Sequence, residues 1–282
     1  MLLNLWSCKI IFDYIIGLAQ DRDNTRSKPN ANMNTQINLP TIIVPARLAS
    51  TRFPKKLIQK VEGKPLILWT AERIIEIAPE FELFFAVDGK ELQVILEDAG
   101  FSAIQTDPEL PSGTDRIAAA NLEIKAPSVI NVQADEPLVE RKHIDSLVTA
   151  LLPDRTSMST LAVPFTEESD FLDPNQVKVI LDSQGYAIYF SRAPIPFYRD
   201  TEGMWEEKKT PLKHIGLYGY KASFLEQFCS EEAGRLEKIE KLEQLRALEW
   251  GAKISVSVVS SPTIGIDSPK DLIKFETHIQ AR

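Results

Sequence analysis

Cationic side chains follow the first β-branched segment of the chain. Residues 41–44 read Thr-Ile-Ile-Val, and Arg47, Arg52 and Lys56 come shortly after them, separated by small and hydroxyl residues. With this spacing, backbone N–H groups can approach phosphate oxygens while the guanidinium and ammonium groups contact them from the sides. The loop therefore indicates a site for a small polyanion. The alternative is a solvated basic face after a core strand.

Two glycine patterns that commonly bind phosphate are missing from the sequence. Neither Gly-x-x-x-x-Gly-Lys-Ser/Thr nor Gly-x-Gly-x-x-Gly occurs. From Arg47 to Lys64 the chain has six cationic residues and one acid, whereas its overall formal charge is −8. A phosphate site in this loop would therefore be neither a P-loop nor the glycine turn of a dinucleotide fold.

Carboxylates follow a later apolar strand, predicted at residues 129–133. Asp135 and Glu136 come directly after it, with Gln133 as its last residue. The carboxyl ends of parallel strands form one rim, so these oxygens should lie near Arg47. Asp135 could cap a helix or close a turn, or it could ligate a hard cation.

Composition excludes several classes of function. A sequence pI near 5.1 argues against a general nucleic-acid binder, which needs a sustained basic face. Cys8 and Cys229 give no disulfide framework, and the three histidines, His143, His214 and His278, are too scattered to predict a zinc site. A metal, if the protein uses one, should be a hard cation held by carboxylates.

The first 38 residues differ from the rest. Residues 10–18 are apolar apart from Asp13, too short to span a membrane, and residues 20–38 are polar and rich in Asn. We expect residues 1–38 to be a disordered extension, or a segment upstream of a true start at Met33. We expect residues 39–282 to form the functional domain, without a membrane anchor.

Hydrophobic periodicity predicts an alternation of strands and helices after residue 41. Strands are predicted at 41–44, 83–87, 103–106, 129–133, 158–165, 214–220 and 254–259, and helices at 65–78, 91–99, 115–122, 236–250 and from Pro269. This order predicts an α/β fold with a mostly parallel twisted sheet and helices on both faces. In the helix at 236–250, the predicted buried stripe is Leu236, Ile239, Leu242 and Leu245.

An insertion at about residues 166–212 interrupts the alternation. Residues 177–181 and 186–190 predict a β-hairpin arm, followed by a polar loop at 199–209 that we expect to move. The hairpin is rich in aromatic and apolar residues that need cover, and a homodimer partner would supply it.

Three further polar segments have structural as well as functional interpretations. Ser112-Gly-Thr-Asp-Arg116 could be a simple helix start, because Ser, Thr and Asp are good caps. His214, beside Tyr218, is typical of a hydrogen-bonded structural group. Asp267 by itself would be the N-cap of the last helix, which has Pro269 in its first turn.

Taken together, these segments resemble one family. Residues 45–56, with Gly63-Lys-Pro65, are similar to the opening motif of the sugar-acid cytidylyltransferases, most closely the 3-deoxy-manno-octulosonate (Kdo) cytidylyltransferase family. Val-Gln-Ala-Asp-Glu-Pro at 132–137 resembles that family's Val-Gln-Gly-Asp-Glu-Pro, with Ala134 in place of Gly. The segment 236–246 matches its Leu-Glu-x-Ile-Glu-x-Leu-Glu-Gln-Leu-Arg, and the matches run in order from Thr41 to about Ile273.

The resemblance implies a nucleotide-diphospho-sugar transferase-like fold and a role for each matched residue. The implied nucleotide-binding residues are Pro45, Ala46, Arg47, Ser50, Thr51, Arg52, Lys56, Ser112, Gly113 and Thr114. The implied sugar-acid contacts are Gln133, Arg192, His214, Tyr218, Glu243 and Gln244. Asp135 and Asp267 would bind Mg²⁺, and Arg47, Arg52, Lys56 and Asp135 would carry the catalysis.

The function that the resemblance implies is activation of Kdo by CTP, giving CMP-Kdo and pyrophosphate for lipopolysaccharide biosynthesis. We expect a cytoplasmic homodimer whose partners are CTP and a 2-keto-3-deoxy sugar acid, and neither nucleic acid nor membrane. Two alternatives stay open: a cytidylyltransferase for another acidic sugar such as a sialic acid, and a non-catalytic nucleotide-sugar binder.

Overall fold

The computed structural model describes residues 39–49, 53–201 and 210–281. Ser50, Thr51 and Arg52 of the basic loop lie outside the described residues, as do the N-terminal segment 1–38 and most of the loop predicted at 199–209. The predictions for these positions therefore stay predictions.

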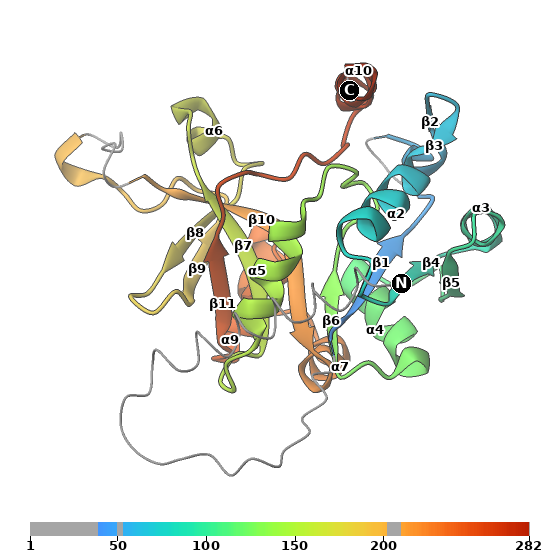
Figure 1. Ribbon diagram of the computed structural model, residues 1–282. Coiled ribbons are helices and arrows are strands. Elements are labelled where there is room, and N and C mark those ends of the chain that lie inside the picture. The colour runs from blue at the N-terminus through green and yellow to red at the C-terminus, as the bar shows by residue number, and fades with distance from the viewer. Residues whose placement is uncertain (1–38, 50–52, 202–209, 282) are drawn as a thin grey trace, which may run out of the picture. The chain divides into compact units, whose positions relative to one another are not determined.

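One large sheet organises the described residues (Figure 1). Its strands are β1 (Thr41–Ala46), β4 (Leu83–Val87), β5 (Ser102–Gln105), β6 (Ser128–Asn131), β7 (Met158–Pro164), β10 (Leu212–Lys221) and β11 (Ile254–Val258). They follow the order β11-β7-β10-β6-β1-β4-β5. The pairs β1–β4, β1–β6, β4–β5 and β7–β11 are parallel, and β10 is antiparallel to β6 and β7. The prediction of a mostly parallel sheet is confirmed.

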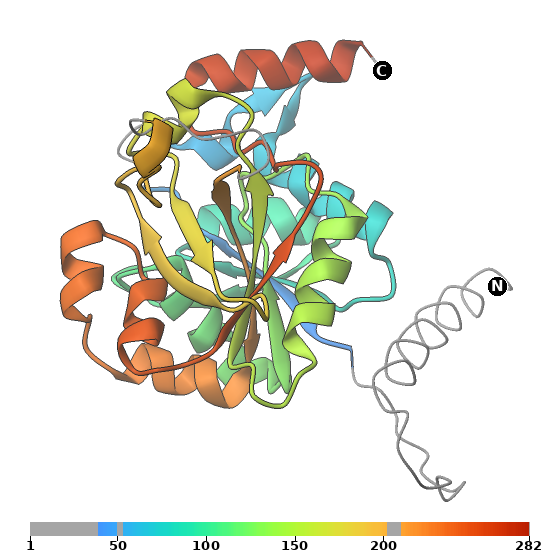
Figure 2. The same ribbon diagram turned by 90° about the vertical axis from the view of Figure 1, so that its left-hand side faces the viewer.

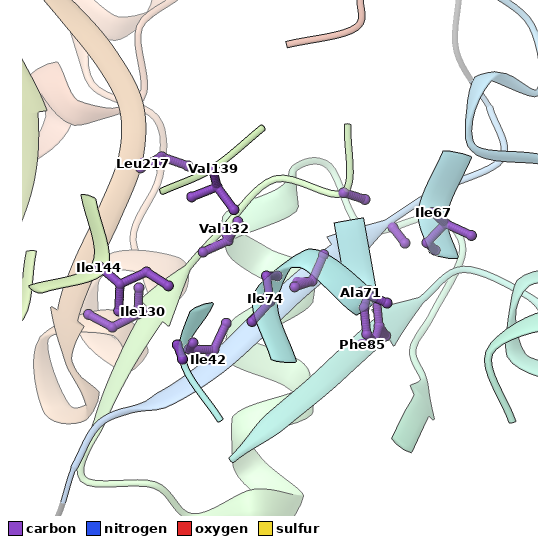
Figure 3. Packing of buried hydrophobic residues seen from close by; sticks show 14 of the residues in the cluster. Ile42, Ile67, Ala71, Ile74, Phe85, Ile130, Val132, Val139, Ile144 and Leu217 are labelled. Atoms are coloured by element: carbon purple, nitrogen blue, oxygen red, sulfur yellow. The ribbon is translucent and has the colours of Figure 1, made fainter. Parts of the chain in front are cut away.

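Successive residues of β1 face opposite sides of this sheet. Ile42 and Val44 belong to a core that includes side chains of α2 (Leu66–Ile77), α3 (Lys90–Asp98) and α5 (Arg141–Leu151). Figure 3 shows Ile42 of β1 near Ile74 of α2, Phe85 of β4 near Ala71 of α2, and Ile130 of β6 near Ile144 of α5. Burial of β-branched and aromatic side chains at about 25 cal/mol per Å² is the main stabilising contribution of such a layer.

Ile43 faces the other side, where a second core lies. That core includes side chains of α4 (Gly113–Ile124), α7 (Ala222–Ser230), α8 (Arg235–Glu240) and α9 (Gln244–Glu249). Helices therefore cover both faces, as the sequence predicts. The sequence analysis did not identify α5, α7 or the small antiparallel pair β2 (Lys60–Val61) and β3 (Lys64–Pro65).

The single helix predicted at 236–250 is wrong. Lys241 adopts a left-handed conformation (φ 54°) that ends α8, and α9 starts three residues later. Ile239 of α8 faces outward, where 67% of it is exposed, while Leu242 and Leu245 are buried. The predicted stripe fails at Ile239 because the heptad-like spacing assumed an uninterrupted helix.

The predicted hairpin is present as β8 (Lys178–Leu181) and β9 (Ala187–Ser191), which pair antiparallel. β8 also pairs with β10, so the arm extends the sheet at one end instead of leaving it. A short helix, α6 (Glu168–Leu172), precedes it. Among the described residues, no helix has the length and apolar character needed to cross a membrane.

The last helix, α10 (Pro269–Gln280), packs on the β2–β3 side of the domain (Figure 2). Phe275 contacts Trp69 of α2 with ring centroids 5.7 Å apart and nearly perpendicular planes. The N-cap is Ser268, whose hydroxyl accepts a hydrogen bond from the N–H of Asp271. The interpretation of Asp267 as the N-cap is therefore wrong, since Asp267 lies one residue earlier and its carboxylate is directed elsewhere.

Candidate active site

A pocket of about 240 Å³ lies at the carboxyl ends of β1 and β6; we call it the phosphate pocket. Its lining residues are Pro45, Ala46, Arg47, Ala49, Lys56, Leu57, Leu110, Ser112, Gly113, Arg116, Gln133, Ala134, Asp135 and Asp267. Nine of these were predicted as site residues. The basic loop, the first turn of α4 and the acidic segment after β6 thus meet at one rim of the sheet, as expected for open α/β sheets.

Lys56 lies between the two aspartates of this pocket, Asp135 and Asp267. Lys55 adopts a left-handed conformation (φ 54°) and starts the short 3₁₀ helix η1 (Lys56–Ile58), which turns Lys56 inward. Its ammonium forms an ion pair with Asp135 and lies 3.4 Å from Oδ1 of Asp267. Both carboxylates are therefore directed at one point.

The Asp135 and Asp267 pair fits a hard divalent cation. Mg²⁺ commonly takes one or two protein carboxylates and completes its shell with water and substrate phosphates. Two carboxylates that already converge on one ammonium can converge on such an ion. Among the described residues, no group of three or more His, Cys, Asp or Glu side chains could hold a metal, so the substrate would have to supply further ligands.

Glu136 adds little negative charge to this pair. Its side chain is buried, and burial, together with the nearby Asp135 carboxylate, raises its pKa to about 8. Thr263 donates a hydrogen bond to Oε1 of Glu136 at 3.2 Å. At neutral pH the side chain is therefore mainly protonated.

Helix α4 presents its N-terminus to the phosphate pocket. The Ser112 hydroxyl caps it by accepting hydrogen bonds from the N–H groups of Thr114 and Asp115. Gly113 lets the helix approach β1 closely, because a Cβ there would lie 3.3 Å from Cγ of Pro45. The positive end of the helix dipole favours an anionic ligand at this position.

Arg116 is a pocket residue that the sequence analysis did not assign. It is 2% exposed and donates hydrogen bonds to Oγ1 of Thr106 at 2.6 Å and to the carbonyl of Asp107 at 3.2 Å. Burial lowers its pKa, with Asp88 opposing that effect. The Ser-Gly-Thr-Asp-Arg segment contained the signal, since Arg116 lies one helical turn after Gly113 and on the same face.

Asp88, directly after β4, is hydrogen-bonded to the backbone of the basic loop. Its Oδ2 accepts a hydrogen bond from the N–H of Leu48 at 2.9 Å. This bond fixes the backbone directly after Arg47, so Asp88 orients the loop. The sequence analysis assigned no role to Asp88, which directly follows the strand predicted at 83–87.

Ala134, where the family pattern has Gly, needs no special backbone. Ala134 is not among the residues with positive φ, so an L-residue fits there without strain. Its carbonyl accepts a hydrogen bond from the Thr70 hydroxyl at 2.8 Å, which holds the segment between Gln133 and Asp135 against α2.

A second pocket of about 300 Å³ adjoins the first; we call it the acceptor pocket. Its lining residues are Gly113, Thr114, Asn131, Gln133, Gly216, Tyr218, Tyr220, Phe228, Lys241, Leu242, Glu243 and Gln244. Gly113 and Gln133 line both pockets. The predicted residues Gln133, Tyr218, Glu243 and Gln244 thus come together beside the phosphate pocket, and Asn131 and Lys241 are additions.

Gln244 has a buried donor that faces no protein acceptor. The residue is 3% exposed, and its Nε2 has no hydrogen-bond partner among the described residues. Its Oε1 accepts a hydrogen bond from the Tyr218 hydroxyl at 3.4 Å. A buried amide without a hydrogen-bond partner costs free energy. A ligand atom that accepts a hydrogen bond from this Nε2 would remove that cost, which would favour binding of the ligand.

The break between α8 and α9 places Glu243 and Gln244 in the pocket. Glu237 of α8 and Arg246 of α9 form a buried bidentate ion pair with two distances of 2.7 Å. Arg246 also donates to the carbonyls of Phe228 and Glu231. These bonds fix the angle between the two helices and therefore the direction of the pocket residues.

His214 stands behind the acceptor pocket. It is not among the lining residues; its Nε2 is 2.9 Å from the Thr160 hydroxyl, and its ring packs on Phe190 and Tyr218. Burial lowers its pKa to about 3, so it is neutral at neutral pH. Its contact with the sugar stays a prediction, and its visible role is to support Tyr218.

Arg192 likewise does not line either pocket. Its guanidinium donates to the carbonyls of Glu240 at 2.7 Å and Pro174 at 3.0 Å, and its backbone N–H donates to the Glu240 carboxylate. Arg192 thus fastens the hairpin to the end of α8. The predicted contact between Arg192 and a substrate carboxylate stays a prediction.

A sequence comparison identifies the family. The profile of the cytidylyltransferase family matches residues 41–254. This chain belongs to the cytidylyltransferase family. The matched region contains both pockets except Asp267.

Individual relatives are similar over most of their length. The chain is 43% identical over 241 residues, 82% of this chain and 94% of the relative, to 3-deoxy-manno-octulosonate cytidylyltransferase of Thermodesulfovibrio yellowstonii. It is 38% identical over 245 residues, 85% of this chain and 98% of the relative, to 8-amino-3,8-dideoxy-manno-octulosonate cytidylyltransferase of Shewanella sp.. A solved structure of CMP:2-keto-3-deoxy-manno-octonic acid synthetase complexed with CTP superposes with a TM-score of 0.79 at 31% identity, covering 86% of this chain and 98% of that one.

Proposed function

We propose that this cytidylyltransferase transfers CMP from CTP to 3-deoxy-manno-octulosonate (Kdo) and releases pyrophosphate, a step in lipopolysaccharide biosynthesis. The observation that carries the proposal is that a cationic pocket and a buried polar pocket share Gly113 and Gln133. A nucleotide triphosphate in the first and a hydroxyl-rich acid in the second would meet at that shared wall. The names of the relatives agree with this pairing of substrates.

In the proposed reaction the anomeric hydroxyl of the sugar attacks the α-phosphorus of CTP. The new bond joins that oxygen to phosphorus, the bond between the α-phosphorus and the bridging oxygen breaks, and the hydroxyl proton is released to solvent. No protein nucleophile is needed, so the residues act by positioning and by neutralising charge. Arg47, Arg52 and Lys56 would contact the phosphates, together with the N-terminus of α4.

Asp135 and Asp267 would hold Mg²⁺. When bound, the ion would neutralise charge that develops on the phosphate oxygens. Lys56, whose ammonium lies between the two carboxylates, would contact the phosphates of CTP.

The acceptor pocket would select the sugar through its buried polar groups. Gln133, Tyr218, Glu243 and Gln244 offer donors and acceptors that match hydroxyl groups. A substrate that lacks one partner would leave a buried group unpaired, which costs about 1–3 kcal/mol. We therefore expect N-acetylneuraminate, with its bulky acetamido group and longer glycerol tail, to be a poor acceptor.

A second acceptor is favoured by one specific observation. The relative from Shewanella sp. is named for the 8-amino-3,8-dideoxy sugar and is nearly as similar as the first. The 8-position differs from Kdo only by an amine in place of a hydroxyl, and Glu243 could accept from either. The two sugars must therefore be compared directly.

We also propose that the enzyme works as a homodimer in the cytoplasm. Among the described residues of the hairpin region, three large apolar side chains are more than half exposed: Leu172, Ile188 and Phe197 at 55%, 58% and 75%. A second copy of the chain would remove them from water. CTP, the proposed co-substrate, is a cytoplasmic metabolite.

Pyrophosphate release tests the proposal. The protein is incubated with each of the four nucleoside triphosphates, with and without Mg²⁺, and with Kdo, 8-amino-3,8-dideoxy-manno-octulosonate or N-acetylneuraminate. We expect release only with CTP, Mg²⁺ and one of the two octulosonates. Tight binding of CMP-Kdo with no turnover would instead support the non-catalytic binder, and preferred use of N-acetylneuraminate would support the sialic-acid alternative.

A further inference from the structure

Thr114 connects the helix that borders the phosphate pocket with the helix that carries the acceptor residues. It is the second residue of α4, is 6% exposed and lines the acceptor pocket. Its hydroxyl donates a hydrogen bond to Oε2 of Glu243 at 2.7 Å. These two residues are 129 positions apart in the chain, so the bond joins segments that only the fold brings together.

The polar groups of Thr114 are committed within the protein. Its N–H donates to the Ser112 hydroxyl at 3.1 Å as part of the helix cap. Its side-chain hydroxyl is used by Glu243. The nucleotide contact that the resemblance implies for Thr114 stays a prediction.

Glu243 needs a donor at this place because its surroundings disfavour its charge. Burial raises its pKa, and the carboxylates of Asp115 and Glu237 raise it further. The Thr114 hydrogen bond acts in the opposite direction and is the larger of two opposing effects, the other being Arg246.

Two tyrosines, a cysteine and a lysine also lie around Glu243. Tyr218 and Tyr220 of β10 and Cys229 of α7 are close enough for the Glu243 charge to raise the pKa of each. Lys241, which precedes the helix break, lines the same pocket but is itself exposed. Among the described residues, Thr114 is the side chain that donates a hydrogen bond to this carboxylate.

We propose that Thr114 is a positioning residue whose hydroxyl holds the Glu243 carboxylate toward the acceptor pocket. The inference rests on the proposed function, because it assigns a role at the acceptor site of that reaction. Residues 112–114 would then have two roles. The N-terminus of α4 faces the phosphate pocket, and the Thr114 side chain fixes the position of Glu243 in the acceptor pocket.

Kinetics of three variants test this role. Thr114→Val keeps the shape of the side chain and removes the hydroxyl, Thr114→Ser keeps the hydroxyl, and Thr149→Val changes an exposed threonine of α5 as the matched control. We expect Thr114→Val to raise the KM for Kdo roughly tenfold, since a hydrogen bond to a charged group is lost, and to change the KM for CTP by less than about twofold. Thr114→Ser should restore the KM for Kdo, and Thr149→Val should behave as the wild type.

The pH profile separates positioning from general damage. Without the Thr114 hydroxyl the pKa of Glu243 rises further, so the acid limb of kcat/KM for Kdo should move to higher pH in Thr114→Val and not in Thr114→Ser. In a Glu243→Ala background, Thr114→Val should have no further effect on the KM for Kdo. An equal rise in both KM values, an unmoved acid limb or full additivity with Glu243→Ala would each overturn the proposal.

A measurement without substrate keeps this inference separate from the proposed function. If the wild type used neither octulosonate, the function would fail, and the contact would then be tested by NMR titration of the ¹³C-labelled Glu243 carboxyl. A higher pKa in Thr114→Val than in the wild type would support the orienting bond. An unchanged pKa would overturn it.

Discussion

Nζ of Lys56 lies 3.4 Å from Oδ1 of Asp267, although 211 positions separate the two residues in the chain. Lys56 follows the first strand, and Asp267 precedes the last helix. The site is therefore complete only when α10 has docked on α2, through contacts such as that of Phe275 with Trp69. A contact across so long a stretch of chain carries a large loop-closure entropy, which the packing of the domain must offset.

Neutralising either carboxylate should stop turnover while leaving CTP binding less affected. We expect Asp135→Asn and Asp267→Asn to lower kcat by about 100-fold or more, because an amide is a weaker ligand for Mg²⁺ and several kcal/mol of charge stabilisation is lost. Steady-state kinetics over a range of Mg²⁺ concentrations measure this. Asp98→Asn, on the exposed end of α3, is the matched control. Near-normal turnover in both site variants would remove the metal assignment.

Truncating the Gln244 side chain should weaken binding of the sugar more than binding of the nucleotide. Gln244→Ala removes the buried, unpaired Nε2 donor, so the KM for Kdo should rise by the equivalent of about 1–3 kcal/mol while the KM for CTP changes little. Gln227→Ala on the exposed face of α7 serves as the control. If Gln244→Ala changed only the KM for CTP, the acceptor pocket would be assigned to the wrong substrate.

The Glu237–Arg246 ion pair should be required for stability. Arg246→Met leaves the Glu237 carboxylate buried without its partner, and we expect the free energy of unfolding in urea to fall by about 3–5 kcal/mol. The double variant Glu237→Met/Arg246→Met should lose less, because neither charge is then buried alone. The pair would be unimportant if Arg246→Met unfolded at the wild-type urea concentration.

Sequence patterns predicted the sheet well and the acceptor pocket only in part. The apolar runs that became β1 and β4 and the alternating Ile-Ser-Val-Ser-Val of β11 were visible in the sequence, because buried strand positions are apolar. The helix at 236–250 was predicted as continuous because its periodicity does not reveal that Lys241 turns left-handed. Arg192, from a segment about 50 residues earlier, donates hydrogen bonds to the carbonyls of Glu240 and Lys241 at that turn, and no local pattern records such a tertiary contact.

In the candidate site, too, local sequence patterns located residues but did not reveal which side chains they contact. Asp135 and Asp267 each occur at a strand end or a helix start, where a cap or a turn would serve equally well. Only their shared approach to Lys56 distinguishes a cation site from two local caps. Arg116 and Thr114 lay inside a recognised segment, but the partners of their side chains, Thr106 and Glu243, come from other elements.

Acid should destabilise the protein through His214. Its folded-state pKa of about 3 lies below the unfolded value of about 6.5. The unfolded chain therefore binds more protons between these values, so stability is fully present above about pH 6.5 and falls as the pH drops toward about 3. Urea unfolding at several pH values should show a weaker pH dependence for His214→Gln than for the wild type. His278→Gln, exposed on α10, should keep the wild-type slope; equal slopes for all three proteins would contradict the account.

The most direct test of the central claim is ³¹P NMR of a reaction containing the protein, CTP, Kdo and Mg²⁺. We expect the three CTP resonances to be replaced by one phosphodiester resonance, that of CMP-Kdo, and by pyrophosphate in equimolar amount. Unchanged CTP, or pyrophosphate accompanied by free CMP and no phosphodiester, would contradict the assignment of this chain as a Kdo cytidylyltransferase.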